Sequence, residues 1–430
     1  MKKHVFLLVL LLLSFSFAAK AESHIMSSTG SDLLISAEGE VLAPAGIYSE
    51  LIPLSNSGMY AGIQFGGTRC ALVSSSGESI TDFVFDSLEY DGTRIVYSMG
   101  GRYGIMTLTG NRLTDAKYSH MVKADDHYLA SKSDYLDDTP DGVWRVYTDA
   151  AEEFTGKKLL YGPFPAGEDM FIAVTAKGEY GYIDGMGEWV EEPAFTWCSE
   201  FRDGFALARN ESGTGIIDSS LQWVVEPQYT GIIPCTFRSG APYLCYRDAS
   251  VFLVSLPEGT EIALPEGIRS LAFTGDKLSG VVNGVLCLLD YDGNILYEAP
   301  EDAAKLTDCG NCILLERCFS CELPFSIVYP DGSESDPYRK LEYAGDLNGE
   351  PCFVEINFDA VRSECEGYTF YDEVPGSRSY GLITSRGKVL INGLTSLRKG
   401  ASGLFTAETD DTIALISLDG SELMHITKDE

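Results

Sequence analysis

The chain has 430 residues, 45% of them hydrophobic, with 44 glycines and a formal net charge of −33. It is too apolar for a disordered chain and too long for a mini-protein that needs covalent or metal support. The negative charge disfavours nucleic acid and anionic membrane surfaces as partners, and it is compatible with basic proteins or cations.

The N-terminal residues 1–21 have the pattern of a secretory signal peptide. Two basic residues precede an apolar stretch over 5–17, and Ala19-Lys20-Ala21 forms a small-residue cleavage site. An uncleaved anchor needs about 20 apolar residues, and the lysine ends this run sooner. The sequence therefore predicts a secreted, extracellular chain with no membrane span, in which a polar segment, residues 22–30, precedes the folded part.

Residues 181–195 and 215–229 are two copies of one unit, 34 residues apart. Seven of fifteen positions are identical: Gly181/Gly215, Ile183/Ile217, Asp184/Asp218, Trp189/Trp223, Val190/Val224, Glu192/Glu226 and Pro193/Pro227. Weaker copies begin at residues 71, 104, 285, 381 and 414, and degenerate ones lie near Trp144, Phe252 and Ile327. We predict about ten units over residues 31–425, followed by a tail, 426–430.

Each unit has the pattern of a short β-meander. An alternating segment such as residues 205–208 predicts a strand with one buried face. A second strand, a tight glycine turn and a third strand follow, and a proline such as Pro193 ends the third. One meander is too small to be stable, so neighbours must cover it. The predicted fold is all-β, with tandem three- to four-stranded meanders in a propeller-like ring. An open β-solenoid or spiral array is the alternative.

These units resemble the WG-repeat (KWG) family, whose motif reads roughly W-G-[YF]-I-D-x-x-G-x-x-V-[IV]-P-x-x-[YF]. The motif positions are Tyr103, Gly104, Gly110, Tyr180, Gly181, Ile183, Asp184, Gly187, Trp189, Pro193, Gly215, Asp218, Trp223, Pro227, Tyr380 and Gly381. Tyrosine replaces the defining tryptophan at three of these positions. The resemblance implies a β-rich repeat protein used as a binding module, and it brings no catalytic residues.

Four of the eleven cysteines form two close pairs, Cys309-x-x-Cys312 and Cys318-x-x-Cys321. Two such pairs can supply four thiolates to zinc. Only five residues separate them, however, against about 15–20 in a zinc ribbon, and residues 313–317 have the pattern of a strand that would hold the pairs apart. We expect one or two disulfides here, as in exported proteins. Unpaired thiols and a zinc site are the alternatives, and the odd total leaves at least one cysteine unpaired or bridged to another chain.

No catalytic motif stands out in the sequence. The HExxH, GxSxG, P-loop and GxGxxG patterns are absent, and a histidine-dependent triad would have to use His120 or His127. Asp184 and Asp218 recur at one unit position, which indicates a structural role in a turn. The sequence predicts a non-catalytic scaffold, without a cofactor, that binds a protein or a surface polymer. The alternative is an extracellular propeller-type hydrolase acting on glycans through carboxylates from several blades.

Overall fold

The computed structural model describes residues 24–28, 30–36, 39–133, 140–147, 152–235, 240–318, 320–365, 368–400 and 403–427. The predicted signal peptide, 1–21, lies outside these ranges. The regular structure within them is β-strand, apart from a single 3-10 turn, η1 (Ser55–Ser57). In this part of the chain no helix has the length and apolar character needed to cross a bilayer.

Most described residues form small antiparallel sheets. The first sheet contains β1 (His24–Ser28), β2 (Ser31–Ile35), β3 (Val41–Pro53), β4 (Tyr60–Gln64) and β5 (Cys70–Val73), and the second contains β6 (Ser87–Tyr90), β7 (Ile95–Met99) and β8 (Arg102–Met106). The third contains β9 (His120–Ala124), β10 (His127–Ser131), β11 (Asp141–Tyr147), β12 (Glu152–Gly167), β13 (Met170–Thr175) and β14 (Tyr180–Ile183).

The next four sheets follow the chain in the same simple order. They contain β15 (Trp197–Cys198), β16 (Phe205–Asn210), β17 (Gly213–Asp218) and β18 (Trp223–Tyr229); β19 (Gly231–Pro234), β20 (Tyr243–Arg247), β21 (Ser250–Ser255) and β22 (Thr260–Ala263); β23 (Arg269–Thr274), β24 (Lys277–Val282), β25 (Val285–Leu289) and β26 (Ile295–Glu298); and β27 (Ala303–Asp308), β28 (Ile313–Arg317) and β29 (Phe325–Val328).

The last two sheets differ by an inserted hairpin. One contains β30 (Leu341–Leu347), β31 (Glu350–Asn357), β34 (Ser379–Thr384) and β35 (Val389–Leu394), and the other contains β36 (Ser396–Lys399), β37 (Phe405–Glu408), β38 (Thr412–Ile416) and β39 (Glu422–Thr427). Between β31 and β34, the strands β32 (Ala360–Cys365) and β33 (Tyr368–Glu373) pair only with each other. This hairpin lengthens its unit, which explains the wide spacing between the turn glycines Gly332 and Gly387.

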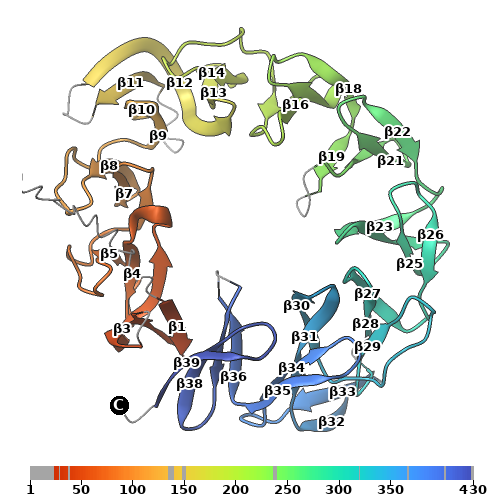
Figure 1. The fold of residues 1–430 in the computed structure, drawn as a ribbon. Coiled ribbons are helices and arrows are strands. Elements are labelled where there is room, and N and C mark those ends of the chain that lie inside the picture. The colour runs from red at the N-terminus through yellow and green to blue at the C-terminus, as the bar shows by residue number, and fades with distance from the viewer. Residues whose placement is uncertain are drawn as a thin grey trace, which may run out of the picture.

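Nine of these sheets are the blades of a closed β-propeller, seen along its axis in Figure 1. The first strand of a blade, such as β19, β23 or β30, lies nearer the centre, and the last, such as β22, β26 or β35, lies nearer the outside. The ring confirms the prediction of an all-β, propeller-like fold, and the open array is not what forms.

Two long strands explain how so many repeats fit into nine blades. Residues 41–48 of β3 pair with β2, and residues 48–53 pair with β4. Similarly, residues 152–159 of β12 pair with β11, and residues 159–167 pair with β13. The five-stranded and six-stranded sheets therefore each contain two repeat units, and the other seven contain one each. The described ring thus carries eleven units, numbered one to eleven below.

The apolar cores lie between successive units. Eleven buried clusters are found in the described residues, and each joins one unit to the next. One of them closes the ring, because Met26 and Ile35 of unit one pack with Ile413, Met424 and Ile426 of unit eleven. Each unit is therefore stabilised by both neighbours, as in other repeat proteins.

Candidate binding grooves

The motif glycines lie where another chain segment comes close. Gly104 of β8 faces the buried Tyr97, and a Cβ on this glycine would be 2.7 Å from the tyrosine ring. A Cβ on Gly215 of β17 would be 2.4 Å from the carbonyl oxygen of Val225 in β18. Contacts at Gly181 and Gly381 are looser, at 3.2 and 3.1 Å. A side chain at these positions would push against a neighbouring strand or segment of the same unit, so the glycines serve the packing of each unit.

The repeated aspartates close the turn before the last stretch of their units, residues 189–195 in unit five and 223–229 in unit six. We call this stretch the outer segment of a unit. Oδ1 of Asp184 accepts hydrogen bonds from the N–H groups of Met186 and Glu188, both at 2.9 Å. Asp218 accepts the same pair of bonds in unit six, at 2.8 and 3.0 Å. The turn ends in a left-handed residue, Gly187 at φ +80°, and Leu221 takes this conformation in unit six at φ +60°. Both carboxylates act within their own turns.

We expect Asp184→Ala to lower the stability by about 1 kcal/mol, because two backbone donors lose their acceptor at an exposed turn. Asp184→Ser is the matched variant, since Ser74 and Thr107 occupy the same position in units two and three and accept the equivalent bond. Thermal unfolding should place the serine variant between the alanine variant and the unsubstituted chain. Equal midpoints for all three would contradict the role of this acceptor.

The remaining motif residues are spread over separate units. The motif tyrosines Tyr103, Tyr180 and Tyr380 lie in β8, β14 and β34, and Gly110 lies in the turn of unit three. Ile183 is fully buried, and Trp189 packs against the core between units four and five. Pro193 lies against Gly181, and Pro227 lies against Gly215. Trp223 meets Phe195 edge to face at 5.9 Å. The structure does not gather these residues into one site.

A hydroxyl group in the outer segment has a role that the motif comparison missed. Oγ1 of Thr81 accepts a hydrogen bond from the N–H of Leu72 at 3.0 Å. Thr114 and Ser335 accept the equivalent bond in units three and nine. Each hydroxyl thus accepts a hydrogen bond from a strand N–H in place of a backbone carbonyl of the irregular outer segment. A threonine or serine three or four residues after the turn glycine is the sequence signal for this contact.

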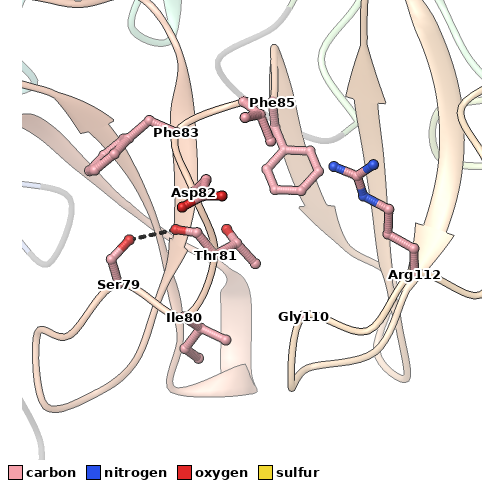
Figure 2. A pocket seen from close by; sticks show the side chains of 9 residues that line it. Ser79, Ile80, Thr81, Asp82, Phe83, Phe85, Gly110 and Arg112 are labelled. Carbon is pink, nitrogen blue, oxygen red and sulfur yellow. Dashed lines mark hydrogen bonds between the residues drawn. The ribbon is translucent and has the colours of Figure 1, made fainter.

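One outer segment forms a wall of a groove of about 550 Å³ between units two and three. Residues 79–85 form one side, and Gly110 and Arg112 form the other. Figure 2 shows Arg112 reaching toward Phe85, with Thr81 and Asp82 on the opposite wall. The groove therefore exposes a cation, a carboxylate and a stretch of irregular backbone side by side.

Aromatic rings hold the Arg112 guanidinium in place. Its central carbon lies 5.3 Å from the centroid of Phe85 and 5.5 Å from that of Tyr97, within the range of cation–π contacts. Both rings are buried, and burial raises the pKa of the Tyr97 hydroxyl, which donates to the Thr114 carbonyl at 2.7 Å. Among the described residues, this guanidinium donates a hydrogen bond to the Met99 sulfur, a weak acceptor. An ordered cation with unused donors suits a carboxylate ligand.

A second groove, of about 600 Å³, follows the equivalent outer segment of unit five, residues 189–193. Trp189, two lysines, Lys158 and Lys177, and three glutamates, Glu179, Glu191 and Glu192, line it. Equivalent outer segments in two units thus form grooves with mixed charge.

The two histidines considered in the sequence are engaged elsewhere. His120 lies edge-on between the rings of Tyr161 and Phe164, each with its centroid at 4.8 Å. His127 is 5% exposed, and its Nε2 lies 2.8 Å from the Gly185 carbonyl of unit five. It borders a small cavity of about 240 Å³, separate from both grooves. Neither histidine lies in a groove, so neither is placed to act there.

The eleven cysteines are unbridged in the structure. Cys309 and Cys312 are buried before β28, whereas Cys318 and Cys321 are partly exposed after it. The sequence-predicted strand between the pairs is β28. In the described ranges, no three histidine, cysteine or acidic side chains are grouped to hold a metal ion, so the four thiols do not converge.

The fold and the grooves define a class of protein: a closed β-propeller of repeated β-meanders with grooves along the outer segments of two units. The family model described as "WG containing repeat" matches residues 180–212. The chain therefore carries a WG repeat, which confirms the resemblance seen in the sequence, and repeat and ring together fit a binding scaffold. A search of curated proteins found no match.

Several solved structures are similar at low identity. BamB from Moraxella catarrhalis is 13% identical, with 68% of this chain and 90% of BamB covered and a TM-score of 0.32. PorZ, a surface component of the type-IX secretion system of Porphyromonas gingivalis, is 10% identical, with 92% and 70% covered and a TM-score of 0.29. AztD from Citrobacter koseri is 11% identical, with 76% and 95% covered and a TM-score of 0.29.

Proposed function

We propose that the chain is a secreted, non-catalytic scaffold, working without a cofactor, that binds a segment of another protein in the groove between units two and three. The observation that carries this proposal is the Arg112 guanidinium, stacked on two buried rings and directed into a groove. A bidentate bond to a carboxylate is specific in geometry and favourable in energy. The exposed Asp82 on the facing wall supplies a site for a basic group of the same segment.

The closed ring supports this role, because each unit packs on two neighbours and keeps the groove walls fixed. Preorganised walls reduce the ordering cost of binding. The predicted signal peptide supports export, and the net charge of −33 supports a partner with basic groups.

Binding of the chain to a library of random peptides, with a panel of immobilised polysaccharides in parallel, tests the proposal. We expect saturable binding to peptides that contain both acidic and basic residues. Arg112→Gln should weaken that binding by roughly ten- to a hundredfold, since it removes a charge-assisted hydrogen bond worth about 1.5–3 kcal/mol. Arg362→Gln, an exposed arginine on the β32–β33 hairpin, is the matched control and should bind normally.

Two results would overturn the proposal. Peptide binding that is equally strong in both variants would show that the groove between units two and three does not bind the peptide. Saturable binding to a polysaccharide, with no binding to peptides, would show that the partner is a surface polymer and not a protein. If that polymer were also cleaved, the three glutamates of the second groove would be the carboxylates to substitute, and the scaffold would be a hydrolase.

A further inference from the structure

The two cysteine pairs that flank β28 differ in accessibility. Cys309 and Cys312 are 2% and 5% exposed and belong to the apolar cluster between units nine and ten. Cys318 and Cys321 are partly exposed, in the loop between β28 and β29. A small reagent in solution therefore meets the second pair and not the first.

The accessible thiols are already close to each other. The Sγ atoms of Cys318 and Cys321 are 3.8 Å apart, and the Cys321 N–H donates to the Cys318 carbonyl at 3.1 Å. The pair is anchored at Cys318, because the N–H of this residue donates to the Asp302 carbonyl at 2.9 Å. The neighbouring Arg317 pairs with Asp302 and with Glu334, at 3.2 and 2.6 Å. The backbone thus keeps the two sulfurs near bonding range.

We propose that Cys318 and Cys321 form a thiol–disulfide exchange site that reacts with low-molecular-weight disulfides. The Cys318 thiolate attacks one sulfur of the small disulfide, forms a mixed disulfide and releases one small thiol. The Cys321 thiolate then attacks the Cys318 sulfur, forms the internal disulfide and releases the second small thiol. Two protein thiols are oxidised, one small disulfide is reduced to two thiols, and the two protons of the protein thiols end on the products.

The surroundings assign the order of the two steps. Hydrogen bonds from the hydroxyl and backbone of Ser320 lower the pKa of the Cys318 thiol, and the two side-chain atoms are 2.9 Å apart. Burial and the neighbouring Cys318 raise the pKa of Cys321. At neutral pH the first thiol therefore has the larger thiolate fraction, which is the reactive form. In the buried pair, the hydrogen bond to Cys312 and burial raise the pKa of Cys309, and both thiols are shielded from reagents in solution.

Oxidised glutathione is the probe for this site, with the reaction followed by mass spectrometry of tryptic peptides. All chains carry Cys365→Ser, which removes the separate exposed thiol of the β32–β33 hairpin. In the parent chain, a glutathione adduct on Cys318 should appear first and give way to a Cys318–Cys321 disulfide. Cys321→Ser should stop at the adduct, and Cys318→Ser should react more slowly by on the order of tenfold. Cys309 and Cys312 are the internal control and should stay reduced.

Three results would overturn the assignment: a stable adduct on the parent chain without an internal bond, equal rates for the two serine variants, or oxidation of the buried pair at the same rate. If a serine variant fails to fold, the order of products in the parent chain decides. A glutathione adduct found on Cys321 and not on Cys318 would contradict the proposed first step.

Discussion

Gly215→Ala should destabilise the propeller by about 3 kcal/mol, the upper part of the range for overpacking a well-packed site. The new Cβ would lie 2.4 Å from the Val225 carbonyl oxygen and 2.8 Å from the Pro227 nitrogen. Both are backbone atoms of β18, so no side-chain rotation can relieve the clash. Moving β18 would also disturb Val225 and Tyr229, which pack against unit seven. The damage should therefore extend from unit six to its neighbour.

Thermal unfolding measures the overall loss, and hydrogen exchange of β17 and β18 shows where it occurs. Both are needed because a chain of this size is not assumed to unfold in two states. Gly231→Ala is the matched control: this glycine also lies in a strand, β19, but a Cβ there meets no heavy atom within 4 Å. Equal midpoints for the two variants would show that the motif glycine has no packing role.

The local parts of each unit could be predicted from the sequence because their interactions stay within a few residues. Asp184 bonds to the N–H groups two and four residues on, and Gly187 takes the positive φ that ends the same turn. Such features recur wherever the short pattern recurs. The meander, the turn glycines and the propeller-like ring followed from them.

Features that depend on contacts between units could not be predicted in this way. In unit six, Leu221 occupies the turn position that glycine takes in other units, so the glycine pattern does not mark this turn. The backbone of Leu221 is left-handed, and its side chain is buried in the core between units five and six. The joining of two units by β3 or by β12 depends on pairing with strands on both sides. The groove arises because Arg112 of unit three meets Phe85 of unit two, and no pattern within one unit contains that pair.

Asp91 makes a polar link between units three and four. It lies in the turn between β6 and β7, where Oδ1 accepts from the N–H groups of Thr93 and Arg94, both at 2.8 Å. Oδ2 accepts from the hydroxyl of Tyr128, a buried residue of β10 in the next unit. Lys123 Nζ lies 3.6 Å from the same carboxylate. One side chain thus holds a turn and joins two blades.

Asp91→Asn should lower the stability at pH 7 by about 2 kcal/mol, because charge-assisted hydrogen bonds to a largely buried carboxylate are lost. Burial raises the pKa of Asp91, but the hydrogen bonds from Tyr128, Arg94 and Thr93 lower this pKa by more than burial raises it. The net shift is downward. A lowered folded-state pKa contributes stability above the unfolded value of about 3.9, and this is lost as pH falls through the folded value.

The difference between Asp91→Asn and the unsubstituted chain should therefore be full at neutral pH and shrink below about pH 4. Urea unfolding at a series of pH values measures it, and Asp411→Asn, at an exposed turn of unit eleven, is the control. A difference that persists unchanged into acid would mean that the asparagine disturbs shape and not charge. A difference that is absent at pH 7 would mean that the Asp91 carboxylate adds nothing to the apolar cluster between units three and four, in which Tyr128 also lies.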